Sequence, residues 1–132
     1  LTFHRAFDMA RDLPEALEDI AGLGIRRILS SGGKPDVPAG AEVLADLVRR
    51  AAGRVSLMPG GGVTEDNPAD IVRATGVREI HLSARQPVRG GMTFFNRDCF
   101  MGTFSKADEY SWREAGAEKI RLAKQRLAEV LR

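Results

Sequence analysis

The feature that most constrains this fold is a regular alternation of β-rich runs with helical patterns. Four short runs are typical of strands and begin about 25 residues apart: Leu1 to His4, Arg26 to Ser30, Arg54 to Met58 and Arg78 to Ser83. Amphipathic segments separate them. Strands that alternate with helices in this way build βα units around a parallel sheet, so we expect an α/β protein.

The segments between the strands carry the end signals of helices. Asp12 and Glu15 form a capping box at the start of the first helix, and Gly22 and Gly24 stop it. The remaining predicted helices run from about Gly40 to Ala52, from Asn67 and Pro68 to Gly76, and from Asp108 to Leu131.

The directions in which the side chains of the fourth predicted strand would point help to choose between two α/β architectures. Ile80 and Leu82 would face the helices, which turns Glu79, His81 and Ser83 to the opposite side. A doubly wound sheet would need that side to be apolar, whereas a barrel interior tolerates polar groups near its catalytic end. We therefore expect residues 1–132 to form a single domain, the C-terminal half of a (β/α)8 TIM barrel with strands 5 to 8, whose first four units are absent.

Composition excludes several classes of function. The chain is 43% hydrophobic and 29% charged, and no apolar run approaches the length of a membrane span, so we expect no membrane partner. Twenty Lys and Arg against eighteen Asp and Glu leave a net charge of +2, which does not make a basic face for nucleic acid. The single cysteine, Cys99, cannot form an internal disulfide and suits a reducing compartment.

Polar or glycine-rich loops follow all four predicted strands, where barrels carry their active sites. Gly60, Gly61 and Gly62 would turn N–H groups toward a phosphate or another anion, and Ser83 and Arg85 would add to this site from the neighbouring strand end. The glycines could instead serve only a tight turn.

The loop after the second run contains Ser31 and Lys34. Lys34 is either a solvated loop charge or a contact to an anionic substrate.

Four further side chains are candidates for catalysis. His4 and His81 both follow strands and could act as general acid and base near neutral pH, or could merely be hydrogen-bonded inside the barrel. Arg5 and Asp8 could form an ion pair that stiffens the loop. Alternatively, Arg5 binds an anionic substrate while Asp8 orients His4 or serves as a base.

The sequence does not indicate a preformed metal site. The two histidines lack the neighbouring ligands that zinc sites require. Cys99, Met101 and Met92 are soft ligands of the kind that copper(I) prefers, but packing or an inert thiol is the simpler explanation for them.

Several of these motifs together resemble the C-terminal half of the CutC family, which is named for copper homeostasis. They are Thr2 to Asp8, Arg27 to Gly32, Gly60 to Val63, Glu79 to His81 and Asp108 to Ser111. The resemblance implies a cytoplasmic (β/α)8 barrel that forms homo-oligomers and is linked to copper(I) handling. By the same resemblance, the central cleft would contain His4, Arg5 and Asp8 from strand 5, Ser31 from strand 6, Gly60 to Gly62 from strand 7, and His81 and Ser83 from strand 8.

Three functions therefore compete, and the third of them is a non-catalytic scaffold. The first is a CutC-like role in intracellular copper(I) handling or binding, which rests on family membership alone. The second is a TIM-barrel enzyme of lyase, isomerase or hydrolase type that acts on a small phosphorylated or carboxylated metabolite. The expected partner is accordingly a copper ion or a small anionic ligand.

Overall fold

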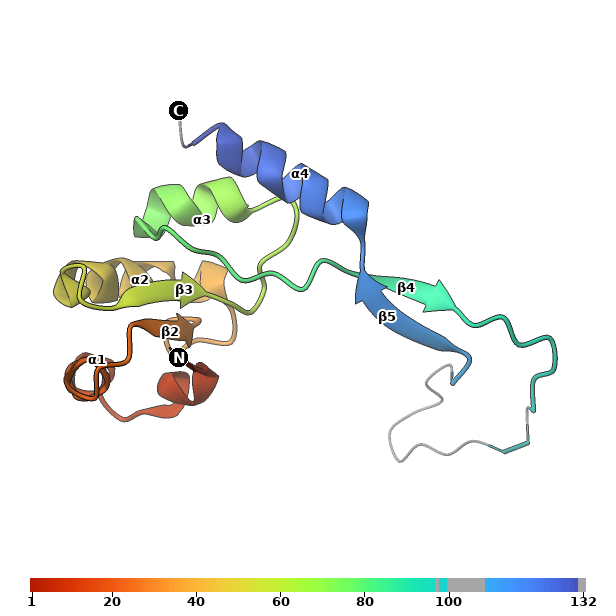
Figure 1. Cartoon of the computed structure of the whole chain (residues 1–132), viewed down its shortest axis with the longest axis horizontal. Coiled ribbons are helices and arrows are strands. Elements are labelled where there is room, and N and C mark those ends of the chain that lie inside the picture. The colour runs from red at the N-terminus through yellow and green to blue at the C-terminus, as the bar shows by residue number, and fades with distance from the viewer. Residues whose placement is uncertain (97, 100–108, 131–132) are drawn as a thin grey trace.

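The computed structural model describes residues 1–96, 98–99 and 109–130 of the chain (Figure 1). In chain order its elements are β1 (Thr2–Phe3), the 3-10 helix η1 (Arg5–Met9), α1 (Leu13–Gly22), β2 (Arg27–Ser30), α2 (Val37–Ala51), β3 (Ser56–Pro59), α3 (Pro68–Thr75), β4 (Arg85–Arg89), β5 (Ser111–Ala115) and α4 (Ala117–Ala128). The predicted α/β class is confirmed. No helix within the described residues is long and apolar enough to cross a membrane.

The first three predicted strands form a parallel sheet in the order β1-β2-β3. In register, Thr2 lies opposite Arg27, and Ile28 of β2 lies opposite Leu57 of β3. Because the strands are parallel, their carboxyl ends meet at one edge of the sheet, which brings the loops that follow them together. That edge is where the candidate site lies.

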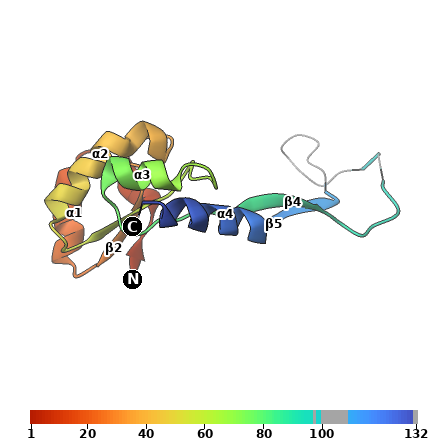
Figure 2. The ribbon, with the colours of Figure 1, turned by 90° about the horizontal axis from the view of Figure 1, so that it is seen from above.

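The core fills the space between this sheet and its helices. Ile28 and Leu57 point toward the helices and are buried, and Figure 2 shows α1, α2 and α3 on one side of the sheet. The buried cluster also contains Phe7, Leu17, Ile20, Val37, Leu44, Leu47, Ala51, Val55, Ile71 and Val77. Residues that alternate with the buried ones, such as Leu29 and Met58, are only half-buried on the other face of the sheet.

The observed helix ends agree largely with those predicted from the sequence. The Asp12 side chain accepts a hydrogen bond from the Glu15 amide at 2.9 Å, so the predicted cap is confirmed. Gly76 adopts a left-handed conformation (φ 73°) directly after α3, as expected for a helix stop. The second helix begins three residues before the predicted Gly40, because the side chain of Asp36 accepts from the Ala39 amide and caps it there.

The prediction of a fourth strand over Arg78 to Ser83 was wrong. That segment runs beside β3, but one backbone hydrogen bond joins it to the strand, from His81 N to Pro59 O at 3.0 Å (Figure 1). Pro59 has no amide hydrogen to return, so the ladder loses a donor at this register position. An ion pair between Arg27 and Glu79 holds the segment to the sheet instead.

The predicted extent of the last helix was also wrong. Residues Ser111–Ala115 form β5, which pairs antiparallel with β4 so that Val88 lies opposite Trp112. The helix begins only at Ala117, after Gly116, whose amide donates to the Ala84 carbonyl at 2.9 Å. The apolar stripe that predicted the helix starts at Ile120, so it carried no information about the residues before it. The outer bounds predicted at 108 and 131 lie outside the described residues.

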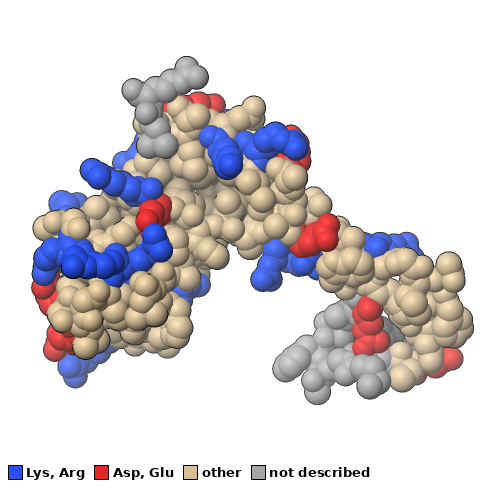
Figure 3. Space-filling model, viewed as in Figure 1, with Lys and Arg blue, Asp and Glu red and all other residues tan. Residues whose placement is uncertain are grey.

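Several charged side chains on the surface form ion pairs. Figure 3 shows Asp and Glu among the Lys and Arg side chains of the face that it presents. Ion pairs join Arg54 to Glu18 (2.7 Å) and Lys119 to Glu65 (2.8 Å). The hydrogen bonds from Arg54 to Glu18 and from Lys119 to Glu65 stabilise the charged carboxylates. They hold the pKa values of Glu18 and Glu65 below the usual range of a glutamate.

Candidate functional site

The carboxylate of Asp8 is the centre of a polar cluster at the carboxyl edge of the sheet. Its Oδ2 accepts from Arg5 Nε at 2.7 Å and from the Ser31 amide at 3.0 Å. Its Oδ1 accepts from the Ser30 hydroxyl at 2.6 Å and from the Gly33 amide at 3.0 Å. Side chains and amides from η1, the end of β2 and the following loop are thereby joined through one group.

Burial and hydrogen bonding act in opposite directions on Asp8. The side chain is only 6% exposed, and this burial by itself raises the pKa of the carboxyl. The hydrogen bonds from Ser30, Arg5, Ser31 and Gly33 outweigh burial and bring the pKa of Asp8 below its usual value. The group is therefore an ionised anchor whose oxygens are already occupied, which favours a positioning role over that of a general base.

Asp8 fixes the direction of the Arg5 guanidinium. Besides its bond to Asp8, Arg5 donates through Nη2 to the Ser31 hydroxyl at 2.5 Å and to the Lys34 carbonyl at 3.3 Å. The remaining nitrogen, Nη1, lies beside Gly61, where a Cβ atom would approach it to 2.8 Å. Nη1 has no acceptor within the described residues, and the side chain is 40% exposed, so it can meet a ligand.

The triglycine loop wraps around this arginine. Gly60 lies against Leu29, leaving no room for a Cβ, while Gly61 (φ 106°) and Gly62 (φ 72°) adopt left-handed conformations. The Gly61 carbonyl accepts from the Val37 amide at 2.9 Å, so the loop also covers the start of α2. The amides of Gly61 and Gly62 find no acceptor in the part of the chain that the structure describes. The glycines thus make a tight turn and also leave two N–H groups for a ligand.

The two histidines have different surroundings. His4 is exposed, and its Nδ1 accepts from the Ala6 amide at 2.9 Å, which caps η1 and leaves Nε2 to carry the proton of the neutral ring. His81 is also exposed, and its ring approaches Gly60 closely enough that a Cβ there would lie 3.4 Å from His81 Cδ2. The structure therefore brings His81, rather than His4, to the triglycine loop.

The other predicted contacts are spread more widely. Lys34 contributes its backbone carbonyl to the Arg5 cluster, whereas its side chain is exposed. Ser83 is exposed at the end of the segment that follows α3. Arg85 belongs to β4, in the hairpin that leads away from the parallel sheet (Figure 1).

Sequence reasoning missed two parts of the site. The Ser30 hydroxyl is fully buried and both donates to Asp8 and accepts from the Gly32 amide at 2.9 Å. Gly40 in α2 packs directly on the Ser31 carbonyl, where a Cβ would come within 1.8 Å. The pair of serines at the end of a buried strand was a usable signal for the first, but nothing near Gly40 in the sequence indicates what it contacts.

The described residues do not form a metal centre. They contain no group of three or more His, Cys, Asp or Glu side chains that could hold an ion. Cys99 and Met92 are exposed between β4 and β5, and Met101 lies outside the described residues.

The fold and site define an α/β protein of parallel strand-helix units with a polar, anion-compatible site at the carboxyl ends of its strands. Comparison with known proteins makes this more specific. The CutC family model matches residues 1–86, and the chain belongs to the CutC family.

The relatives carry the same family name. A CutC protein from Vibrio parahaemolyticus is 47% identical over 111 residues, which are 84% of this chain and 44% of that protein. The human copper homeostasis protein cutC homolog is 40% identical over 121 residues, 92% of this chain and 44% of the human protein. The chain thus spans about half the length of the curated relatives it matches.

A solved structure supports the same grouping. The CutC protein of Streptococcus agalactiae is 34% identical and superimposes with a TM-score of 0.59, covering 61% of this chain and 40% of the other.

Proposed function

We propose that the cluster around Arg5 binds a small phosphorylated or carboxylated metabolite, in an enzyme of lyase, isomerase or hydrolase type. The observation that carries this proposal is the open Nη1 of Arg5 beside Gly61, in a loop where the Gly61 and Gly62 amides have no acceptor among the described residues. A guanidinium and convergent backbone N–H groups are the donors that phosphate and carboxylate oxygens prefer. Asp8 holds the arginine in place and offsets part of its charge.

The candidate catalytic groups follow from this placement. His81 lies beside the triglycine loop and is the better placed general acid or base, and His4 would act through its Nε2. Arg5 and Asp8 would bind and position the anion. Ser31 supports Arg5, and the exposed side chains of Lys34, Ser83 and Arg85 would extend the anion contact.

Replacing Arg5 should weaken anion binding. We expect Arg5→Gln to bind inorganic phosphate at least about 10-fold more weakly than the unaltered chain, since one charge-assisted contact is worth about 1.5 to 3 kcal/mol. Arg5→Lys should recover only part of the affinity, because an ammonium group cannot reproduce the planar, bidentate hydrogen bonding of a guanidinium. Titration followed by backbone amide NMR shifts of Gly61 and Gly62 measures the effect.

Arg11→Gln is the matched control for this experiment. Arg11 is 92% exposed and makes only a 3.9 Å ion pair with Glu15, so its loss should leave phosphate binding unchanged. Equal phosphate affinities in the Arg5→Gln and unaltered chains would contradict the proposed site.

We also propose that this chain is the C-terminal half of a (β/α)8 barrel and works as part of a homo-oligomer or beside a complementary half. The support is a sheet with helices on one face and half-buried Arg27, Leu29, Ser56 and Met58 on the other, in a chain about half as long as its relatives. A parallel sheet is stable only when both of its faces are covered.

This proposal predicts that stability depends on protein concentration. Raising the concentration 100-fold should stabilise a self-associating chain by up to about 2.7 kcal/mol, with a higher thermal midpoint. Leu29→Glu, on the uncovered face, should abolish the dependence, whereas Leu23→Glu, at the 74% exposed C-cap of α1, should not. A sharp transition at the same temperature at all concentrations would refute self-association.

Copper(I) handling in the cytoplasm is the second candidate function. The name of the human relative favours it, and the exposed Cys99 thiol offers one soft ligand. Titration with copper(I) under reducing conditions, on the unaltered chain and on Cys99→Ser, tests it. Binding no tighter than millimolar would argue against a direct copper role for this chain.

A further inference from the structure

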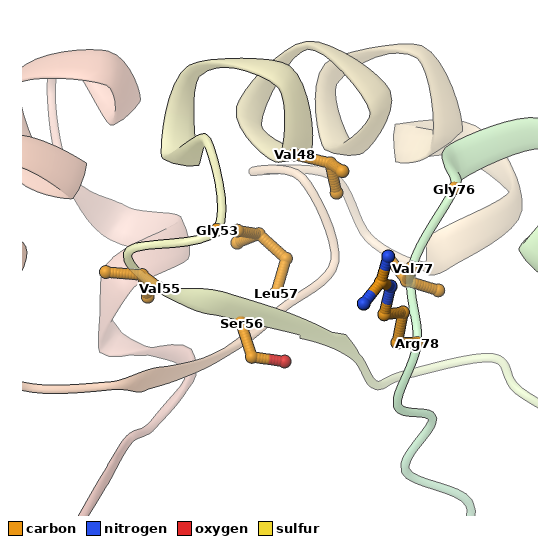
Figure 4. Close-up of a pocket in the computed structure, with 8 residues that line it drawn as sticks. All are labelled: Val48, Gly53, Val55, Ser56, Leu57, Gly76, Val77 and Arg78. Carbon is orange, nitrogen blue, oxygen red and sulfur yellow. The ribbon is translucent and has the colours of Figure 1, made fainter.

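A cavity lies at the opposite end of β3 from the triglycine loop. It has a volume of about 350 Å³ and opens between α2, the start of β3 and the segment that follows α3 (Figure 4). Its lining residues are Val48, Gly53, Val55, Ser56, Leu57, Gly76, Val77 and Arg78. This volume falls in the range of small-ligand pockets.

The cavity exists because β3 is left unpaired on one side near its start. Ser56 donates its amide to the Arg26 carbonyl at 2.8 Å, on the β2 side. Along a strand, the backbone N–H groups of successive residues point alternately to the two neighbouring positions in the sheet. The Leu57 amide therefore points away from β2, toward Val77. The chain after α3 returns to the sheet only at His81, which leaves this edge open.

Four of the eight residues that line the cavity are aliphatic. Val55, Leu57 and Val77 are each at most 5% exposed, and Val48 of α2 closes the top in the view of Figure 4. In the same view the Ser56 side chain points away from the cavity, so its hydroxyl does not add to the lining chemistry. An apolar group of a few carbons would contact these side chains.

Arg78 supplies the charge at this cavity. Its guanidinium points into the space between Val48 and β3 (Figure 4). Its neighbours Arg27 and Arg54 have carboxylate partners, Glu79 and Glu18, but Arg78 forms no ion pair within the described part of the chain. A guanidinium without a carboxylate, beside an open backbone amide, is suited to receive a carboxylate from outside.

We propose that this cavity binds a small monocarboxylate with a short, branched aliphatic tail. The Arg78 guanidinium would bind the carboxylate with two hydrogen bonds, and the Leu57 amide would donate a further one to the same carboxylate. The aliphatic tail would lie against Val48, Val55 and Val77. One guanidinium matches a single negative charge, and a doubly charged phosphate would leave one charge without a partner among the lining residues. This site is separate from the one at Arg5 and does not depend on it.

Titration of the 132-residue chain with isovalerate, followed by NMR of valine and leucine methyl groups, tests this proposal. Isovalerate should shift the methyl signals of Val48, Leu57 and Val77. Acetate, which lacks the tail, and 3-methylbutan-1-ol, which lacks the charge, should each bind at least about 10-fold more weakly. Inorganic phosphate should not shift these signals.

Variants separate this site from a general effect of charge. Arg78→Gln should weaken isovalerate binding at least about 10-fold, and Arg78→Lys should restore part of it. Arg26→Gln, which removes an exposed arginine just before β2, and Arg5→Gln should leave it unchanged. An unaltered amide spectrum away from the cavity confirms that each variant is folded. The proposal is overturned if isovalerate causes no shift, if the alcohol or phosphate binds as tightly, or if Arg78→Gln binds like the unaltered chain.

Discussion

Asp8→Asn is expected to lower the free energy of unfolding by about 3 kcal/mol, because it uncouples a buried carboxylate from Arg5 and from the donors of three further residues. The Asp8 side chain is 6% exposed and its oxygens accept from Ser30, Ser31 and Gly33. An asparagine keeps the shape of the side chain but loses the charge. Its amide nitrogen is a donor and would stand where a carboxylate oxygen of Asp8 accepted a hydrogen bond, so two donors would face each other. The guanidinium would then lose its partner.

Asp70→Asn provides the matched control. Asp70 makes an ion pair with Arg73 within α3 at 2.9 Å, but its side chain is 78% exposed. Exposed pairs of this kind contribute about 0.5 kcal/mol or less, so the control should be nearly neutral in urea unfolding. Equal losses in the two variants would show that the Asp8 cluster contributes no more than a surface ion pair.

The Asp8 effect should also depend on pH in a defined direction. Its pKa is lowered in the folded protein, mainly by the hydrogen bonds that outweigh burial. The stabilisation is therefore fully present above the unfolded value of 3.8 and is lost as the pH falls through the lower, folded value. The difference in stability between the unaltered chain and Asp8→Asn should be constant near neutral pH and shrink below pH 3.8.

Gly40→Ala should be at least as damaging, with a loss of about 3 kcal/mol or more. A Cβ at Gly40 would lie 1.8 Å from the Ser31 carbonyl oxygen and 3.2 Å from Gly32 Cα. Both are backbone atoms, so no rotamer change relieves the clash, and α2 or the loop must move. Since Ser31 also donates to Asp8, the shift would disturb the proposed anion site and should weaken phosphate binding as well.

Gly22→Ala tests whether this effect is specific. Gly22 ends α1 and has no left-handed conformation, and a Cβ at this position would meet no heavy atom within 4 Å, so alanine fits there. We expect it to be neutral or to stabilise the chain by up to about 1 kcal/mol. Thermal and urea unfolding compare the two variants. A loss below about 1 kcal/mol for Gly40→Ala would contradict the close packing of α2 on the loop.

Local signals in the sequence were reliable where the structure they predict is local. The cap at Asp12 and the stop at Gly76 depend on hydrogen bonds and dihedral angles within a few residues, and both were predicted correctly. The strands β1, β2 and β3 were also found, because short β-rich runs that alternate with helical patterns are typical of a parallel sheet.

Signals that depend on distant partners failed. The segment from Arg78 to Ser83 has the composition of a strand, but a strand also needs a neighbour that can return its hydrogen bonds, and Pro59 cannot. Helical periodicity after Ile120 was extended backward over Ser111–Ala115, which instead pair with β4. Pairing between segments far apart in the chain leaves no periodic mark on either of them.

The sequence by itself determined the family, the alternation of strands and helices, and the position of polar loops after the strands, since each of these follows from motifs and local periodicity. Only the tertiary structure decided what the loop residues do. It directed the oxygens of Asp8 toward Arg5 and Ser31, engaged Nδ1 of His4 with a backbone amide, and left Nη1 of Arg5 beside Gly61. The physical reason is that hydrogen-bond partners and burial set the role of a polar group, and the Ser30, Ser31 and Gly33 partners of Asp8 lie 22 to 25 residues away in the chain.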